Sequence, residues 1–303
     1  MSTCQVDVEF QSAEDVCSAW FFLPDGVDEP GPCVVMGHGL GLTRHCGLRE
    51  LALGFAGAGY RVLLFDYRGF GDSGGEPRQV ISFRKQLADW AAAIDYARSR
   101  PEVDSSRIIT WGFSLGAGHA LTAAVRDPRV AAVVTVVPMF DGLSSTLAAV
   151  KRWNPWNFLR TVARGTKDLI GSWFGRSTTS VPLTAAPGEL GLLTSADAHP
   201  GYRALVPSDF NFDTAARIAL LFWTYAPGLH LRRFSRPILV FPSSVDQINP
   251  PGPTLRRVRR CKSATIVELH CDHMQAALEP NRSRLVHATL DFLNERGPSA
   301  QVQ

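Results

Sequence analysis

The chain has 303 residues, a formal net charge of +3, 45% hydrophobic residues and 19% charged residues. This composition is ordinary for a folded globular enzyme and excludes an intrinsically disordered chain. The length allows one or two domains. No apolar run is long enough to predict a membrane span.

The first half of the chain alternates predicted strands and helices. Residues 6–10 and 19–23 are expected to form a leading β-hairpin. Strands with continuous Val, Ile and Leu runs alternate with amphipathic helices, which indicates an α/β fold with a mostly parallel central sheet flanked by helices. The expected strands are 33–36, 60–65, 107–111 and 130–137, and the expected helices are 48–58, 83–98 and 117–125.

The alternation stops after Asp141 and resumes at Arg236. The predicted strands 238–241 and 264–269 and a closing helix at 284–295 follow. Residues 1–141 and 236–303 are therefore assigned to an α/β core, and residues 142–235 to an inserted lid, expected to be helical.

The insertion is rich in aromatic residues and is expected to lie over the carboxyl edge of the sheet, where open α/β folds bind ligands. Aromatic side chains at this edge are candidates for a substrate pocket. The candidates are Phe113, Trp153, Trp156, Trp173 and Phe222.

The most informative motif is the G-x-S-x-G sequence at residues 112–116, with Ser114 at its centre. It follows the strand 107–111 and precedes an alanine-rich helix, which is the context of a nucleophile elbow. The two glycines allow a tight turn that exposes the serine hydroxyl. At the start of the helix, the backbone N–H of Leu115 could stabilise a negatively charged oxygen.

A second glycine-rich loop, residues 38–41 (HGLG), follows the strand 33–36. Its glycines let the backbone approach a reacting carbonyl group closely. We expect the N–H of Leu40 to be the second donor of an oxyanion hole, beside that of Leu115. His38 is interpreted as a structural residue that orients the loop.

An activated serine needs a base and an acid, in the chain order Ser, acid, His. Asp246 and His273 each follow a late strand, so both should reach the edge that carries Ser114. Histidine suits proton transfer near neutral pH, and the acid fixes its tautomer. Asp141 remains an alternative acid.

Two residues close to His273 in the sequence could also act at the site. His270 is a weaker candidate for the base because it lies nearer the strand, and Asp272 could tune the base although adjacent side chains at a strand end usually point apart.

No metal or cofactor site is predicted. The six cysteines form no C-x-x-C pair, and His, Cys and Asp residues lack metal-ligand spacing. The basic run at 256–262 lacks interleaved aromatic residues, so it is interpreted as a solvated helix face and not as a nucleic-acid site. The N-terminal residues show no secretory signal, and a cytoplasmic location is expected.

The elbow, the oxyanion loop and the late Asp and His resemble an α/β-hydrolase. Residues 66–73 (DYRGFGDS), 75–79, 101–104, 118–120 and 193–202 (LTSADAHPGY) are similar to the fungal polyketide thiohydrolases and polyketide transferases and their bacterial relatives. The likeness extends from about Val6 to Leu290. One departure is Cys271-Asp272, where the family tends to have glycines before the catalytic histidine.

The resemblance implies Ser114, Asp246 and His273 as a catalytic triad and the Leu40 and Leu115 amides as an oxyanion hole. The expected activity is hydrolysis of an ester or thioester of an apolar, polyketide-like acyl chain through an acyl-Ser114 intermediate. Transfer of the acyl group to an alcohol or amine is the first alternative. A lyase, cyclase or ligand-binding use of the fold is the second.

The expected partner is a small acyl substrate, which a carrier protein could present. Neither nucleic acid nor membrane is expected as a partner, and a homodimer is left open.

Overall fold

The computed structural model describes residues 3–26 and 29–298. Met1 and Ser2, part of the segment in which no secretory signal was expected, lie outside these ranges, as do residues 27–28 and 299–303. Within the described ranges, no helix has the length and apolar character needed to span a bilayer.

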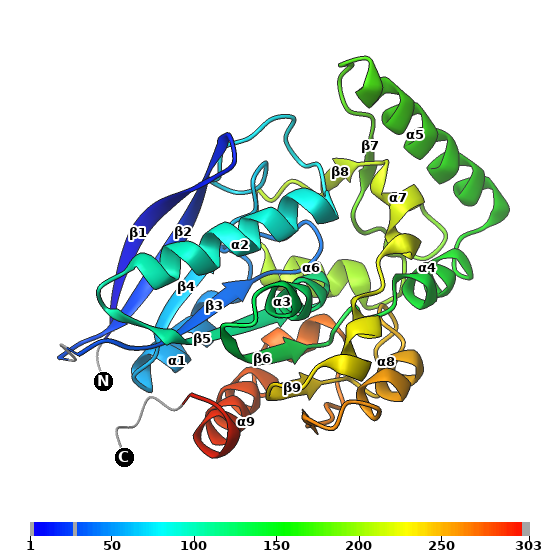
Figure 1. Cartoon of the computed structure of the whole chain (residues 1–303). Coiled ribbons are helices and arrows are strands. Elements are labelled where there is room, and N and C mark those ends of the chain that lie inside the picture. Colours follow the sequence, from blue (N-terminus) through cyan, green and yellow to red (C-terminus); the bar gives the residue numbers. More distant parts are fainter. Residues whose placement is uncertain (1–2, 27–28, 299–303) are drawn as a thin grey trace.

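An eight-stranded sheet runs through the molecule in the order β1-β2-β4-β3-β5-β6-β9-β10 (Figure 1). The pairs β1–β2 and β2–β4 are antiparallel, and the other neighbouring strands are parallel. The predicted hairpin and mostly parallel sheet are thus confirmed. The strands are β1 (Thr3–Ser12), β2 (Asp15–Pro24), β3 (Gly31–Gly37), β4 (Arg61–Phe65), β5 (Val103–Phe113), β6 (Val130–Val136), β9 (Ile238–Phe241) and β10 (Ala264–Ile266).

The last strand is shorter than the sequence predicts. An apolar run suggests a strand up to Leu269, but β10 ends at Ile266. Leu269 instead forms an isolated bridge with Ser243, so the chain still follows the sheet edge on its way to His273.

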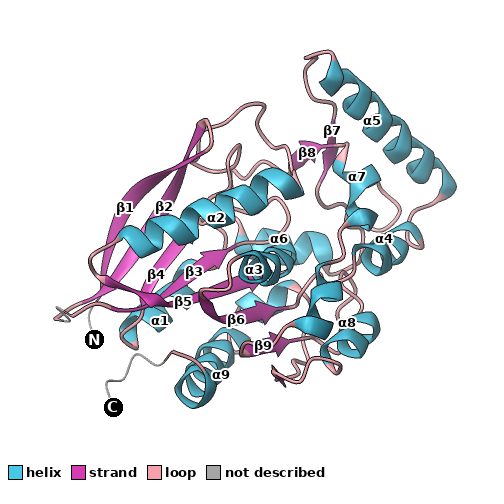
Figure 2. Ribbon diagram, viewed as in Figure 1, coloured by secondary structure: helices cyan, strands magenta, loops and turns pink. Residues whose placement is uncertain are grey.

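Helices cover both faces of the sheet (Figure 2). Strand residues alternate between two cores: Val35 packs with α2 and α3 on one face, whereas Val34 and Met36 pack with α1 and α9 on the other. The central strands are therefore apolar on both sides, as expected for a covered parallel sheet. The helices of the core are α1 (Arg49–Gly57), α2 (Phe83–Ser99), α3 (Leu115–Arg126), α8 (Pro251–Val258) and α9 (Asn281–Arg296).

Residues 142–235 lie between β6 and β9 and contain more than helices. A small antiparallel sheet pairs Val181 with Thr214, a feature that the sequence pattern did not predict because its strands have three residues each. The elements are α4 (Gly142–Val150), α5 (Pro155–Trp173), β7 (Ser180–Pro182), α6 (Ala198–Leu205), β8 (Asp213–Ala215), α7 (Ile218–Leu221), η1 (Phe222–Thr224) and η2 (Pro227–Arg233).

Parts of this insertion pack on the core. Tyr202 and Leu205 of α6 join the core on the α1 side, and Leu231 of η2 joins the core on the α3 side. Helix α5, in contrast, projects from the body (Figure 1). The insertion is thus anchored near the sheet and extends away from it at α5.

Candidate active site

Ser114 occupies the turn between β5 and α3. Its backbone has φ 56° and ψ −115°, a conformation that is unfavourable for a residue with a side chain. The turn is held by two hydrogen bonds: the Ser114 amide donates to the Val136 carbonyl at 2.9 Å, and the Met139 amide donates to the Ser114 carbonyl at 3.0 Å. The surrounding sheet therefore imposes the strained turn.

The two glycines of the elbow are required by close backbone contacts. A Cβ atom on Gly112 would lie 2.2 Å from the carbonyl oxygen of Gly116, and one on Gly116 would lie 2.4 Å from that of His38. Real Cβ atoms do not approach backbone atoms this closely. The strand, the turn and the 38–41 loop can pack together only because both side chains are absent.

Ser114, His273 and Asp246 form one continuous hydrogen-bonded chain. The Ser114 Oγ lies 2.9 Å from Nε2 of His273, and Nδ1 of His273 lies 2.7 Å from Oδ2 of Asp246. Because a carboxylate can only accept, Nδ1–H donates to Asp246, and Nε2 is left to accept the serine proton. All three side chains are buried.

The Asp246 carboxylate is held in place by the loop that carries it. Its Oδ1 accepts hydrogen bonds from the amides of Ile248 and Asn249, both at 2.8 Å. Oδ2 is thereby directed at His273. Two backbone amides and one imidazole use most of the acceptor capacity of the carboxylate, so its orientation is fixed.

The structure separates the alternative acid from the base. Asp141 caps α4 by accepting from the Ser144 amide at 3.1 Å, and its other oxygen pairs with Arg257. Sequence position alone could not decide between Asp141 and Asp246, because both follow strands that end at the same edge. The side-chain contacts of Asp141 assign it to the anchoring of α4 and α8.

His270, the alternative base, has a different partner from His273. His270 Nδ1 lies 2.8 Å from the hydroxyl of Ser244, at the exposed side of the loop. Asp272 is half-buried, and its amide donates to the Gln275 side chain. Burial raises the pKa of the Cys271 thiol to about 11, so this cysteine stays protonated near neutral pH.

The backbone of the 38–41 loop passes directly beside the nucleophile. A Cβ atom on Gly39 would lie 3.1 Å from Cβ of Ser114, and Leu40 and Ser114 line the same cavity. Leu115 is the first residue of α3, where a helix leaves amides without intrahelical acceptors. The 38–41 loop and the first residue of α3 thus both lie next to Ser114.

Tyr202 fixes this loop from the insertion. Its phenol donates a hydrogen bond to the Leu40 carbonyl at 2.9 Å, and both residues are buried. This hydrogen bond ties α6 of the insertion to the 38–41 loop beside Ser114. No role was predicted for Tyr202, although it lies in the 193–202 segment that carries the family resemblance.

His38 is fully buried, and burial lowers its pKa to about 3. Its Nδ1 contacts the Gly39 carbonyl at 3.3 Å, and its Nε2 lies 3.6 Å from the buried Asp66. A neutral ring packed under the loop agrees with the structural interpretation of His38.

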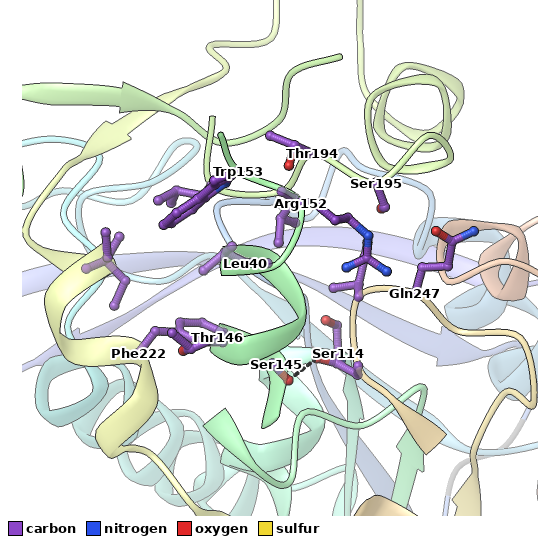
Figure 3. Close-up of a pocket in the computed structure, with 17 residues that line it drawn as sticks. Leu40, Ser114, Ser145, Thr146, Arg152, Trp153, Thr194, Ser195, Phe222 and Gln247 are labelled. Carbon is purple, nitrogen blue, oxygen red and sulfur yellow. Dashed lines mark hydrogen bonds between the residues drawn. The ribbon is translucent and has the colours of Figure 1, made fainter. Parts of the chain in front are cut away.

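A cavity opens above Ser114, beneath α4 and the start of the insertion (Figure 3). About 60 Å³ of it can be occupied by the centre of a water-sized sphere, and the cavity is partly open to solvent. Aliphatic and aromatic side chains form much of its wall, and several polar side chains are set among them. The lining includes Leu40, Ser114, Thr146, Arg152, Trp153, Thr194, Ser195, Phe222 and Gln247.

The structure places two of the five aromatic candidates in the cavity wall and three elsewhere. Trp153 and Phe222 line the cavity. Phe113 does not, but its ring packs on that of His273 with 5.6 Å between centroids. Trp156 and Trp173 are 68% and 72% exposed on α5, so their assignment to the pocket is corrected. Aromatic content alone does not show which face of a helix is turned inward.

One group of side chains could contact a cation. Ligand atoms of His45, Asp66 and Asp72 lie within 4.8 Å of one another, an arrangement that sequence spacing did not reveal. Arg44 already pairs with Asp72 at 2.8 Å, and the Arg44 and Asp72 amides donate to Asp66. The protein itself thus supplies partners for these carboxylates.

Residues 32–280 match the family model described as alpha/beta hydrolase fold, and the chain therefore belongs to the α/β-hydrolase family. It is 39% identical over 295 residues to the quorum-quenching protein AidA of Acinetobacter baumannii (strain MDR-ZJ06), covering 97% of this chain and 95% of that protein.

Other similar proteins agree with the resemblance noted in the sequence. Thiohydrolase apmlB of Arthrinium phaeospermum is 44% identical over 108 residues, but the match covers only 36% of this chain and 35% of that protein. Among solved structures, alpha/beta hydrolase GrgF from Penicillium sp. sh18 superposes with a TM-score of 0.82. It is 23% identical and the match covers 97% of this chain and 99% of that one, which shows a shared fold.

Proposed function

We propose that this α/β-hydrolase is a serine esterase or thioesterase that acts through an acyl-Ser114 intermediate. The observation that carries the proposal is the hydrogen-bonded chain from Asp246 through His273 to Ser114, at the floor of a largely apolar cavity. Similarity to a thiohydrolase supports a thioester, and the apolar walls support an acyl chain as the bound group.

In the first half-reaction, Ser114 Oγ attacks the acyl carbonyl while Nε2 of His273 takes its proton. Asp246 stabilises the resulting imidazolium, and the Leu40 and Leu115 amides stabilise the oxyanion. His273 then returns the proton to the departing thiol or alcohol, which leaves the acyl group on Ser114.

In the second half-reaction, His273 removes a proton from water as the water attacks the acyl-enzyme. Collapse of the second oxyanion breaks the ester bond to Ser114, and the proton passes to Ser114 Oγ. The products are the free acid and the regenerated enzyme. An alcohol or amine in the place of water would yield acyl transfer with the same residues, so product analysis must accompany rate measurement.

The test is covalent labelling with a fluorophosphonate, read by intact mass, on the parent and on Ser114→Ala in parallel. We expect one adduct per chain on the parent and none on the variant. Thioesters and esters with acyl chains of increasing length follow, with ester-bearing quorum-sensing signals included because of the similarity to AidA. Ser114→Ala should lower kcat by at least about three orders of magnitude.

A folded parent that reacts with neither the fluorophosphonate nor a smaller sulfonyl fluoride, and that turns over none of these substrates, would refute the proposal. Labelling at a residue other than Ser114 would refute the assignment of the nucleophile.

A further inference from the structure

Arg152 is a cation at the acyl cavity that pairs with no acidic side chain among the residues that the structure describes. It lines the cavity together with Ser114, and Figure 3 shows its guanidinium group turned to the side that holds Gln247 and Ser114. Its one hydrogen bond among the described residues goes from Nη1 to the Ala148 carbonyl at 2.7 Å. No Asp or Glu lines the cavity. Four of the five N–H groups of the guanidinium are therefore available.

Four residues that line the same cavity each carry a polar atom without a hydrogen-bond partner. Thr146 Oγ1, Trp153 Nε1, Thr194 Oγ1 and Ser195 Oγ are buried and form no hydrogen bond with any described residue. A buried polar atom without a partner is costly, and native proteins rarely retain one without a reason. Because these four residues line the same cavity as Arg152, a polar ligand bound there could supply the missing partners.

We propose that Arg152 binds an anionic group of the substrate, a carboxylate or a phosphate, while the neighbouring hydroxyls and the Trp153 indole bind oxygens along the same molecule. This inference rests on the proposed function and specifies its substrate: an oxygenated acyl thioester or ester with a negative charge. The charge could lie at the far end of the acyl chain or on the phosphate of a phosphopantetheine thiol.

Two pairs of substrates distinguish these sources. The first pair compares the adipoyl and heptanoyl thioesters of N-acetylcysteamine, which differ by a terminal carboxylate; succinyl, glutaryl and suberoyl homologues vary its distance. The second pair compares heptanoyl-pantetheine with heptanoyl-4′-phosphopantetheine, which differ by one phosphate. We expect the parent to favour the anionic member of one pair at least tenfold in kcat/KM, equivalent to about 1.4 kcal/mol.

Arg152→Met should abolish that preference, and Arg152→Lys should restore part of it. Lys151→Met is the matched control, because it removes a positive charge from the adjacent, exposed position and should retain the preference. The proposal would be overturned by equal kcat/KM values within both pairs for the parent, or by a preference for the anionic substrate that remains in Arg152→Met.

Failure of this inference can be separated from failure of the proposed function by binding to Ser114→Ala, measured calorimetrically with the same pairs. Tighter binding of the anionic member, lost in Ser114→Ala with Arg152→Met, supports the Arg152 site even if no thioester is hydrolysed. Equal binding overturns the site even if Ser114 is labelled.

A separate observation concerns the outward face of α5. Trp156, Leu159, Ile170 and Trp173 are 68%, 57%, 45% and 72% exposed, on a helix that projects from the body (Figure 1). Isolated apolar residues on a surface are normal, but four along one helix stripe mark an interaction face.

The exposed side chains along this face of α5 have the same order of sizes when the helix is read from either end. With the exposed Ala163 and Thr166 the stripe follows steps of 3, 4, 3, 4 and 3 residues, the spacing of a coiled-coil seam. Read from both ends, Trp156 matches Trp173, Leu159 matches Ile170, and Ala163 matches Thr166. A two-fold axis through the centre would set each residue against its match in an antiparallel copy, with small residues where the helices meet most closely.

The geometry points to a second copy of this chain as the occupant of the α5 face. Arg160 and Lys167 flank the stripe on one side. The two-fold arrangement places Arg160 near Lys167 of the second copy, and Lys167 near Arg160 of the second copy. This like-charge contact is weakened by salt, so dimerisation should strengthen as NaCl rises from 50 to 500 mM. Adsorption to an anionic membrane, which an amphipathic basic helix could also support, would weaken.

Sedimentation velocity at both salt concentrations tests the dimer, with Ala163→Glu expected to yield monomers. The register is tested by oxidative cross-linking in a Cys4→Ser background, because Cys4 is the exposed thiol among the described residues. A mixture of Ala163→Cys and Thr166→Cys chains should cross-link, whereas Leu159→Cys with Thr166→Cys should not. A monomeric parent at 500 mM NaCl, or salt-sensitive binding to anionic vesicles without a dimer, would overturn the assignment.

Discussion

The phenol of Tyr202 donates a hydrogen bond to the carbonyl oxygen of Leu40 across 2.9 Å, joining α6 of the insertion to the loop beside Ser114. The two residues are 162 positions apart in the chain. The insertion therefore does more than line the cavity, because it also holds the carbonyl of the residue whose N–H is proposed to bind the oxyanion.

Tyr202→Phe should lower kcat about tenfold and leave KM nearly unchanged, because a misaligned oxyanion donor weakens transition-state binding more than ground-state binding. Tyr225→Phe is the control, since it removes a buried phenol that bonds to His119 and Thr122 behind α3. Steady-state kinetics on both variants test the role. Equal kcat values for the two variants would reduce Tyr202 to a purely structural residue.

Asp246→Asn should reduce kcat by about four orders of magnitude, because an amide can donate to Nδ1 of His273 and so favour the wrong tautomer. Asp141→Asn should stay within a few-fold of the parent, because asparagine still caps α4. The rate of fluorophosphonate labelling measures both effects independently of substrate choice. A large loss for Asp141→Asn and a small one for Asp246→Asn would reverse the assignment of the acid.

Gly116→Ala should destabilise the protein by about 3 kcal/mol or more, because the new Cβ atom would lie 2.4 and 2.6 Å from the backbone oxygens of His38 and Gly37. Gly252→Ala is the matched control: nothing lies within 4 Å of its Cβ position, and stability should be unchanged or slightly raised. Urea unfolding measures the difference. A stable, active Gly116→Ala would show that the elbow and oxyanion loop can separate.

His119 should make the protein sensitive to acid. Burial lowers its pKa from 6.5 to about 3, so the folded state excludes a proton that the unfolded state binds. The associated stability is fully present above pH 6.5 and falls as pH decreases toward 3. Linkage predicts a loss of about 2 kcal/mol between pH 7 and pH 5 from this one group.

His119→Gln should therefore give a shallower decline of unfolding free energy with falling pH, although its stability at pH 7 is expected to drop. The ring contacts Tyr225 at 2.7 Å and Gln86 at 3.0 Å, and glutamine can replace only part of these contacts. Urea titrations at pH 7, 6 and 5 measure how the free energy of unfolding of each protein changes with pH. Parallel slopes for parent and variant would assign the acid sensitivity to other groups, of which His38 is the first candidate.

The fold and the chain of polar residues at Ser114 could be predicted from the sequence for definite reasons. Buried parallel strands such as β6 are continuous apolar runs, and a serine between two glycines after such a strand has few structural explanations. Asp246 was predicted as the acid with Asp141 as the alternative, because the assignment depends on whether a side chain meets Arg257 or His273 in space.

The insertion was less predictable. Its elements follow no repeating order, and the three-residue strands β7 and β8 are too short to produce a pattern. Arg152 lies in a turn, where arginine is common, so only the folded structure shows that its side chain faces the cavity. The same limit explains why Trp153 and the exposed Trp156, three positions apart, could not be distinguished beforehand.

The strained backbone at Ser114 also bears on how this chain can change over evolutionary time. Glycine adopts a positive φ without the steric conflict that a side chain creates, so Ser114→Gly should raise the melting temperature while removing the hydroxyl. A lineage released from the need for this serine would gain stability from a single substitution. Stability and retention of the serine therefore oppose each other at this one position. Without selection for the hydroxyl, a single substitution is expected to give a more stable protein that lacks it.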